Sequence, residues 1–128
     1  MFFSRAYASV AGLSYKDRGN VAGFDFEIGA FTKDDNPHTL DLSGILPEGV
    51  TRFKIRLELA GSNTGRWFKI RENGNADWIN CAFVTQQTAG LGVGHEYDVI
   101  CDSNRLVEYA AVSSGITVLS LIIKGWWI

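Results

Sequence analysis

The sequence feature that most constrains the fold is a strict alternation of apolar and charged side chains between residues 50 and 60. A period of two places every apolar side chain on the same face of an extended strand, whereas a helix would spread these residues around its whole surface. The segment therefore predicts a half-buried antiparallel strand, with one face on a core and the other facing solvent or a partner. The expected core side chains are Phe53, Ile55, Leu57 and Leu59, and the expected outward ones are Arg52, Lys54, Arg56 and Glu58.

Shorter segments with strand signals occur along most of the chain, separated by turn residues. Leu40 and Leu42 alternate with polar residues, and residues 43–49 then contain a proline and a glycine that suit a turn. Seven or eight short strands at this spacing predict an all-β antiparallel two-sheet sandwich, with less than about a tenth of the residues in helix. Residues 1–20 lack a clean period, and a short helix near residues 3–12 is one interpretation. The other expected strands lie at residues 24–28, 66–71, 81–87, 95–101, 105–111 and 116–124.

The composition indicates a single globular domain without a strong electrostatic preference. The chain has 128 residues, of which 46% are hydrophobic and 20% charged, and its formal net charge is −2. A nearly neutral chain lacks the broad positive field that non-specific nucleic-acid binding requires, so we expect no nucleic-acid partner. The longest apolar run, at residues 116–123, is interrupted by Thr117 and Ser120 and is far shorter than the ~20 residues of a membrane span. We therefore expect no membrane insertion.

No arrangement of residues in the sequence indicates catalysis, a metal or a cofactor. The acidic residues are scattered over expected strand faces and turns, without the pairing that acid–base catalysis requires. Asp34-Asp35-Asn36 offers oxygen ligands for calcium, but its spacing is not that of an EF-hand loop, and a turn is the favoured interpretation. His38 and His95 are the only histidines and lack partners at ligand spacing. The glycine-rich residues 90–94 lack the Gly-Lys-Ser/Thr ending of a phosphate loop, so a hairpin connection is favoured.

Four stretches combine packing and turn residues in a recognisable way: DLSGILPEG at 41–49, FKIRENGN at 68–75, CDSNRLVEYAA at 101–111 and GWW at 125–127. In these motifs, residues 38–128 resemble a group of small uncharacterised β-sandwich domains of phage and bacterial genomes. The resemblance implies a jelly-roll-like sandwich of the kind used in phage tail, fibre and capsid-decoration proteins, often as trimers, and it does not imply an enzyme. Residues 1–37 match nothing in that group and are expected to be a less regular N-terminal arm for attachment or subunit contacts.

The two cysteines leave two interpretations open. If residues 81–87 and 95–101 form a hairpin centred on Leu91, Cys81 lies opposite Cys101, and a cross-strand disulfide becomes geometrically feasible. The alternative is two buried thiols that pack as small apolar groups. The thiols are favoured because virion proteins assemble in a reducing cytoplasm.

The tryptophans are the strongest candidates for a surface role. Trp67 shares its side of an expected strand with Lys69, and Trp78 follows a turn among polar residues. Such a Trp could stack on a sugar ring or anchor a protein interface, the interface being favoured, and burial in the chain's own core is a third interpretation for Trp78. Trp126 and Trp127 point to opposite faces if the last strand continues, so one of them needs cover, for which a neighbouring subunit is a natural source. The candidate binding residues are Arg66, Trp67, Arg71, Asp77, Trp78, Trp126 and Trp127.

The leading hypothesis is a non-enzymatic structural protein of a phage or phage-derived virion, assembled in the host cytoplasm. It would act as a homo-oligomer, by resemblance a trimer, that docks on other virion proteins. Sixteen aromatic residues favour subunit contacts, since alternation sends some of them outward. The alternative is a carbohydrate-binding module that recognises host-surface glycans, and the two functions are compatible on one particle.

Overall fold

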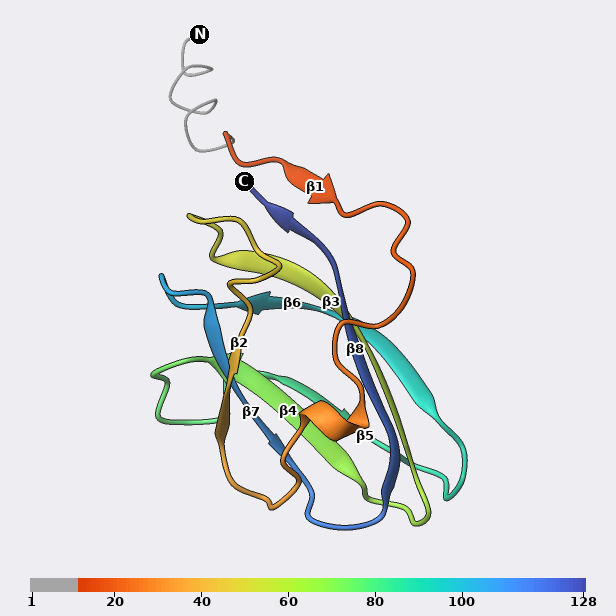
Figure 1. Cartoon of the computed structure of the whole chain (residues 1–128). Helices are drawn as coiled ribbons and strands as arrows, with labels where there is room; N and C mark the ends of the chain where they lie inside the picture. Colours follow the sequence, from red (N-terminus) through yellow and green to blue (C-terminus); the bar gives the residue numbers. More distant parts are fainter. Residues whose placement is uncertain (1–11) are drawn as a thin grey trace, which may run out of the picture.

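The alternating segment forms the central strand β3 (Arg52–Gly61), which pairs on one side with β6 (Val93–Ile100) and on the other with β8 (Ile116–Trp127). A computed structural model describes residues 12–128 (Figure 1). The short strand β1 (Tyr15–Asp17) pairs with β8 and completes the first sheet, in the order β1-β8-β3-β6. The second sheet has the order β2-β7-β4-β5 and consists of β2 (His38–Asp41), β4 (Trp67–Glu72), β5 (Ala82–Thr85) and β7 (Leu106–Ala111).

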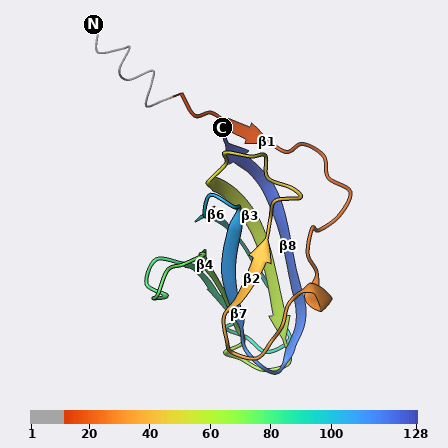
Figure 2. The same ribbon diagram turned by 60° about the vertical axis from the view of Figure 1, so that its left-hand side comes forward.

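The strand pairing follows a nested pattern. β1 pairs with β8, β2 with β7, β3 with β6 and β4 with β5, all antiparallel. This is the pattern of one long ribbon folded over on itself, which the additional pairs β3–β8 and β4–β7 close into two layers (Figure 2). Eight strands in this order form a jelly roll, so the predicted all-β jelly-roll-like sandwich is confirmed. Within residues 12–128, the helical content is the single 3₁₀ turn η1 (Ile28–Ala30).

The core lies between the two sheets and follows the predicted alternation. The four apolar side chains predicted to face inward from β3 are at most 1% exposed, whereas the charged ones between them are exposed or half-buried. On the second sheet, the rings of Phe31, Phe68 and Tyr109 pack against one another with centroids 5.1 to 5.8 Å apart. The period-two prediction for β3 is therefore confirmed.

The strand expected at residues 24–28 is wrong. Only a single bridge joins Phe26 to Leu121 of β8, and the 3₁₀ turn follows at once. The carboxylate of Asp25 accepts the backbone N–H of Ile123 at 2.8 Å and also bonds Arg18. Because a side chain takes the N–H that a continuing strand would have used, the segment crosses beside β8 instead of extending the sheet.

The expected hairpin of residues 81–87 and 95–101 is also wrong. β5 pairs with β4 and β6 pairs with β3, so the two segments are edge strands of different sheets. The glycine-rich connection between them crosses from one sheet to the other, and Gln86 anchors it by donating from Nε2 to the carbonyl oxygens of Gly61 (2.8 Å) and Leu91 (3.3 Å). Cys81 and Cys101 are both free thiols.

Three further expectations concern the N-terminal part and membranes. The helix suggested near residues 3–12 lies almost entirely outside the described residues. The division of the chain at residue 38 stays a prediction, and Phe31 from the N-terminal side belongs to the core. Across residues 12–128, we find no helix that is long and apolar enough to cross a membrane.

Candidate binding surface

The outer face of the second sheet carries an unusual row of side chains on β4. Phe68 and Ile70 point into the core, so Trp67, Lys69 and Arg71 point outward. On the neighbouring strand β5, Phe83 lies directly opposite Lys69 and is 53% exposed. The alternation of a half-buried strand thus places aromatic and cationic groups side by side on the outside.

Trp78 completes this row from the loop between β4 and β5. Its ring lies 3.9 Å from the guanidinium carbon of Arg71 and 4.5 Å from Nζ of Lys69, which is itself 5.1 Å from the ring of Trp67. All three distances are within the range of cation–π attraction. The result is an alternating stack in the order Trp67, Lys69, Trp78 and Arg71.

The two cations of the stack differ in their charge balance. Arg71 is buried, and its Nε donates to the Glu108 carboxylate on β7 at 3.0 Å. Its Nη2 forms an ion pair with the same carboxylate at 2.9 Å, while Nη1 has no partner among the described residues. Lys69 takes part in none of the ion pairs found within residues 12–128. Residues 1–11 contain no Asp or Glu. The aromatic stack therefore carries one positive charge that no carboxylate balances.

A hollow of about 260 Å³ opens between Trp78 and Phe83. Lys69 and Cys81 also line it, and Ile79, which is 92% exposed, stands at its rim. We call Trp67, Lys69, Trp78, Ile79 and Phe83 the aromatic face.

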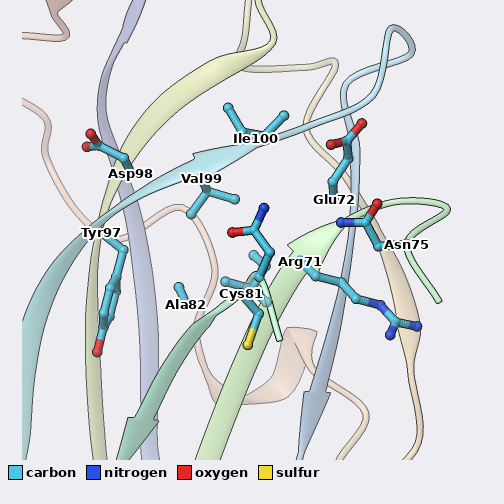
Figure 3. A pocket seen from close by; sticks show the side chains of 11 residues that line it. Arg71, Glu72, Asn75, Cys81, Ala82, Tyr97, Asp98, Val99 and Ile100 are labelled. Carbon is cyan, nitrogen blue, oxygen red and sulfur yellow. The ribbon is translucent and has the colours of Figure 1, made fainter. Parts of the chain in front are cut away.

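A second, smaller slot of about 130 Å³ lies between the edges of the two sheets. Figure 3 shows Tyr97 and Val99 reaching from β6 toward Ala82 and Cys81, while the guanidinium of Arg71 points away from the slot. The hydroxyl of Tyr97 donates to the Phe83 carbonyl oxygen at 3.1 Å and so ties the two edges together.

The thiols next to this slot are not activated. Cys81 donates to the carbonyl oxygen of Trp78 at 3.0 Å, and burial raises its pKa. Burial likewise raises the pKa of Cys101 to about 11. Because the thiolate is the nucleophilic form, neither cysteine is suited to nucleophilic chemistry near neutral pH.

The structure brings together three of the seven candidate binding residues, namely Trp67, Trp78 and Arg71. Arg66 lies elsewhere, among the loops at the end of the sandwich, where its Nη1 donates to the Ser114 carbonyl oxygen at 2.7 Å. Asp77 is exposed in the loop that carries Trp78.

The C-terminal tryptophans lie on the first sheet. Trp126 packs against the core, whereas Trp127 packs at a tilt against Tyr15 of β1, with centroids 4.9 Å apart, and lies under the guanidinium of Arg52 at 4.2 Å. Residues of β1 and β3 in the same chain therefore cover Trp127. The expectation that a neighbouring subunit supplies this cover is not needed for Trp127.

The residues considered as calcium or metal ligands organise turns. Asp34 accepts hydrogen bonds from the Asn36 backbone and from the His38 ring (2.8 Å), and the bond from His38 lowers the pKa of Asp34. Asp35 accepts the backbone N–H of Ser113 at 3.0 Å. His95 is exposed on β6. Over the described part of the chain, no three His, Cys, Asp or Glu residues form a group that could hold a metal ion.

Sequence reasoning missed Phe83 and Ile79. The segment around Phe83 alternates only weakly, so the pattern did not reveal which of its faces is buried. Ile79 lies in a loop, where periodicity carries no information. The signal that could have found Phe83 is the turn at residues 73–75, because a connection folding back on β4 makes the next strand the neighbour of Lys69.

No protein-family profile and no curated protein sequence matches the chain. Among solved structures, a carbohydrate-binding module from Cellvibrio mixtus lichenase 5A, in complex with cellotriose, is similar with a TM-score of 0.39 and 14% identity, over 88% of this chain and 87% of that chain. The coat protein of Tobacco streak virus is similar with a TM-score of 0.35 and 7% identity, over 90% of this chain and 81% of that chain. The likeness to both is distant, and the description of this chain as a jelly roll rests on its own strand order.

Proposed function

We propose that the chain is a non-enzymatic structural protein of a phage or phage-derived particle, such as a capsid-decoration, tail or fibre component. It acts by self-association and by docking on other virion proteins, and it resides in the virion after assembly in the host cytoplasm. The jelly-roll fold and the resemblance of residues 38–128 to small phage β-sandwich domains support this proposal.

The observation that carries the proposal is an exposed apolar end on the first sheet. Leu13 is 63% exposed, Ile128 43% and Tyr15 36%, and two backbone hydrogen bonds of 3.0 Å between Ser14 and Ile128 bring these residues to the same end of the first sheet. We call Leu13, Tyr15 and Ile128 the assembly end. A cluster of exposed apolar side chains is typical of a protein contact surface.

The assembly end suits a second copy of the chain better than the aromatic face does. Around a threefold axis that passes through a patch, equivalent residues of the copies lie close to one another, so the unbalanced charge of Lys69 would approach its own copies there. Arg52, whose guanidinium lies over the Trp127 ring beside the assembly end, is already paired with Asp98 at 3.0 Å. The choice of three copies follows from the sequence resemblance.

Sedimentation equilibrium tests this proposal. The wild-type protein should have about three times the monomer mass of 14.1 kDa. The double variant Leu13→Asp, Ile128→Asp should sediment as a monomer, because a charge in an apolar contact loses its hydration. The matched control is Leu91→Asp, at a residue that is 62% exposed on another part of the surface. A wild-type monomer at high micromolar concentration, or equal dissociation by the control, would contradict the proposal.

A second candidate function, carbohydrate recognition on the same particle, is favoured by the hollow between Trp78 and Phe83. Aromatic rings present a flat apolar surface to the face of a sugar ring. The aromatic face lies on the second sheet and the assembly end on the first, so both functions can operate in one assembly. Binding of glycans by the wild type and its loss in Trp78→Ala, with the fold retained by circular dichroism, is the expected result.

A further inference from the structure

We propose that the hollow of the aromatic face binds a sugar ring that carries a carboxylate. This inference rests on the second candidate function and names its ligand class. The sugar ring lies between Trp78 and Phe83, and its carboxylate pairs with Nζ of Lys69.

Lys69 differs in its charge balance from the cations on the outer face of the first sheet. On the outer face of the first sheet, every lysine and arginine of β3 and β8 has a carboxylate partner. The pairs are Arg52–Asp98, Lys54–Asp98, Arg56–Glu58 and Lys124–Glu96. Lys69 occupies an equivalent outward position on β4, but it has two tryptophan rings around it and no carboxylate among the described residues. A negatively charged ligand would supply the missing partner.

The side chains around the hollow are held in place before a ligand arrives. The guanidinium of Arg71 is held by a hydrogen bond and an ion pair to Glu108 and supports the ring of Trp78 from 3.9 Å away. Phe83 is positioned by its pairing opposite Lys69 in the sheet. Preorganised side chains lose little conformational freedom on binding, which favours recognition of a small ligand.

The size of the hollow suits a small ligand. Its volume of about 260 Å³ is below the usual range for drug-sized ligands, about 300–1,000 Å³, and suits a single ring. An acidic peptide, the other polymer with carboxylates, would most readily add as a strand to the edge of β5. That edge is partly used, because the Phe83 carbonyl oxygen already accepts the hydroxyl of Tyr97.

Matched pairs of acidic and neutral sugars test the inference by titration calorimetry. We would use trigalacturonate with its methyl ester, sialyllactose with lactose, and a hyaluronan hexasaccharide with its carboxyl-reduced form. In at least one pair the acidic member should bind about tenfold more tightly at low salt, and the difference should shrink as salt rises. Lys69→Gln should remove this difference, whereas the control Lys16→Gln, an exposed lysine on β1, should retain it.

The outcomes separate the two levels of the proposal. Equal binding of the acidic and neutral members in every pair overturns the carboxylate inference and leaves carbohydrate recognition standing. Binding of none of the sugars, while the sedimentation result holds, overturns both the inference and the carbohydrate function. Binding of a polyglutamate peptide in place of the sugars shows a peptide-docking face and likewise overturns the inference. If Trp78→Ala unfolds, Lys69→Gln alone decides the charge requirement, because it removes the charge of a side chain that lies outside the core.

Discussion

Replacing Leu57 with alanine tests the core of the sandwich most severely. Leu57 is 0% exposed and lies at the centre of β3, opposite His95 on β6 and Leu121 on β8. Leucine-to-alanine changes in protein cores cost about 2.7–5.0 kcal/mol, and the cost grows with the cavity that remains. Strands on both sides hold the β3 backbone, so the site has little freedom to collapse. We expect the free energy of unfolding to fall by about 3–4 kcal/mol.

The assay is urea denaturation followed by tryptophan fluorescence, together with thermal unfolding. At about 4 °C per kcal/mol for a domain of this size, the melting temperature should fall by about 12–16 °C. The control is the adjacent Arg56→Ala, which removes an exposed ion pair with Glu58 and should cost less than about 1 kcal/mol. A cost below about 1 kcal/mol for Leu57→Ala, or equal costs for the two variants, would refute the assignment of inner and outer faces.

Three further results are expected. Gly125→Ala should lower the free energy of unfolding by about 1–3 kcal/mol in urea denaturation, because a Cβ there would collide with the Lys16 backbone and push β1 away from β8. The control Gly44→Ala should be neutral, because Gly44 has open space around it. The melting temperature should stay level from pH 7 to about 5 and fall below about pH 4. Burial alone would raise the pKa of Asp98, but hydrogen bonds from two β3 cations outweigh it, so the pKa is lowered overall. A carboxyl group whose pKa is lowered in the folded state contributes stability that is lost as the pH falls through that pKa. A rise in melting temperature on acidification to pH 4 would be inconsistent with these bonds. Cys101 should resist iodoacetamide at pH 8 until urea unfolds the chain, because burial raises its pKa to about 11, and rapid native-state labelling would exclude the buried position.

The sequence predicted those parts of the fold in which local chemistry repeats. The alternation in β3 predicted the inner and outer face of each residue, because a shift of one residue would bury the charged side chains and expose the apolar ones. The turn at residues 73–75 and the outward position of Lys69 beside Trp67 were also readable from the pattern. These features depend only on neighbours within a few residues.

The parts that failed depend on long-range pairing. The glycine-rich residues after Thr85 look like a hairpin turn, yet they cross between sheets because β5 and β6 each find a partner far away in the sequence. Asp25 ends a strand pattern through a bond to a backbone group 98 residues away. The cover of Trp127 by Tyr15 likewise joins the two ends of the described chain, so no local pattern could reveal it.

Hydroxyl-radical footprinting read by mass spectrometry tests most directly whether the first sheet serves assembly and the second sheet serves ligand recognition. The protein would be labelled at a dilution where it is monomeric and at a concentration where it is assembled. We expect Leu13 and Tyr15 to lose reactivity on assembly, while Trp78 and Phe83 stay as reactive as in the monomer. Protection of Trp78 and Phe83 with unchanged reactivity of Leu13 and Tyr15 would contradict the account, because the aromatic face would then be the subunit contact.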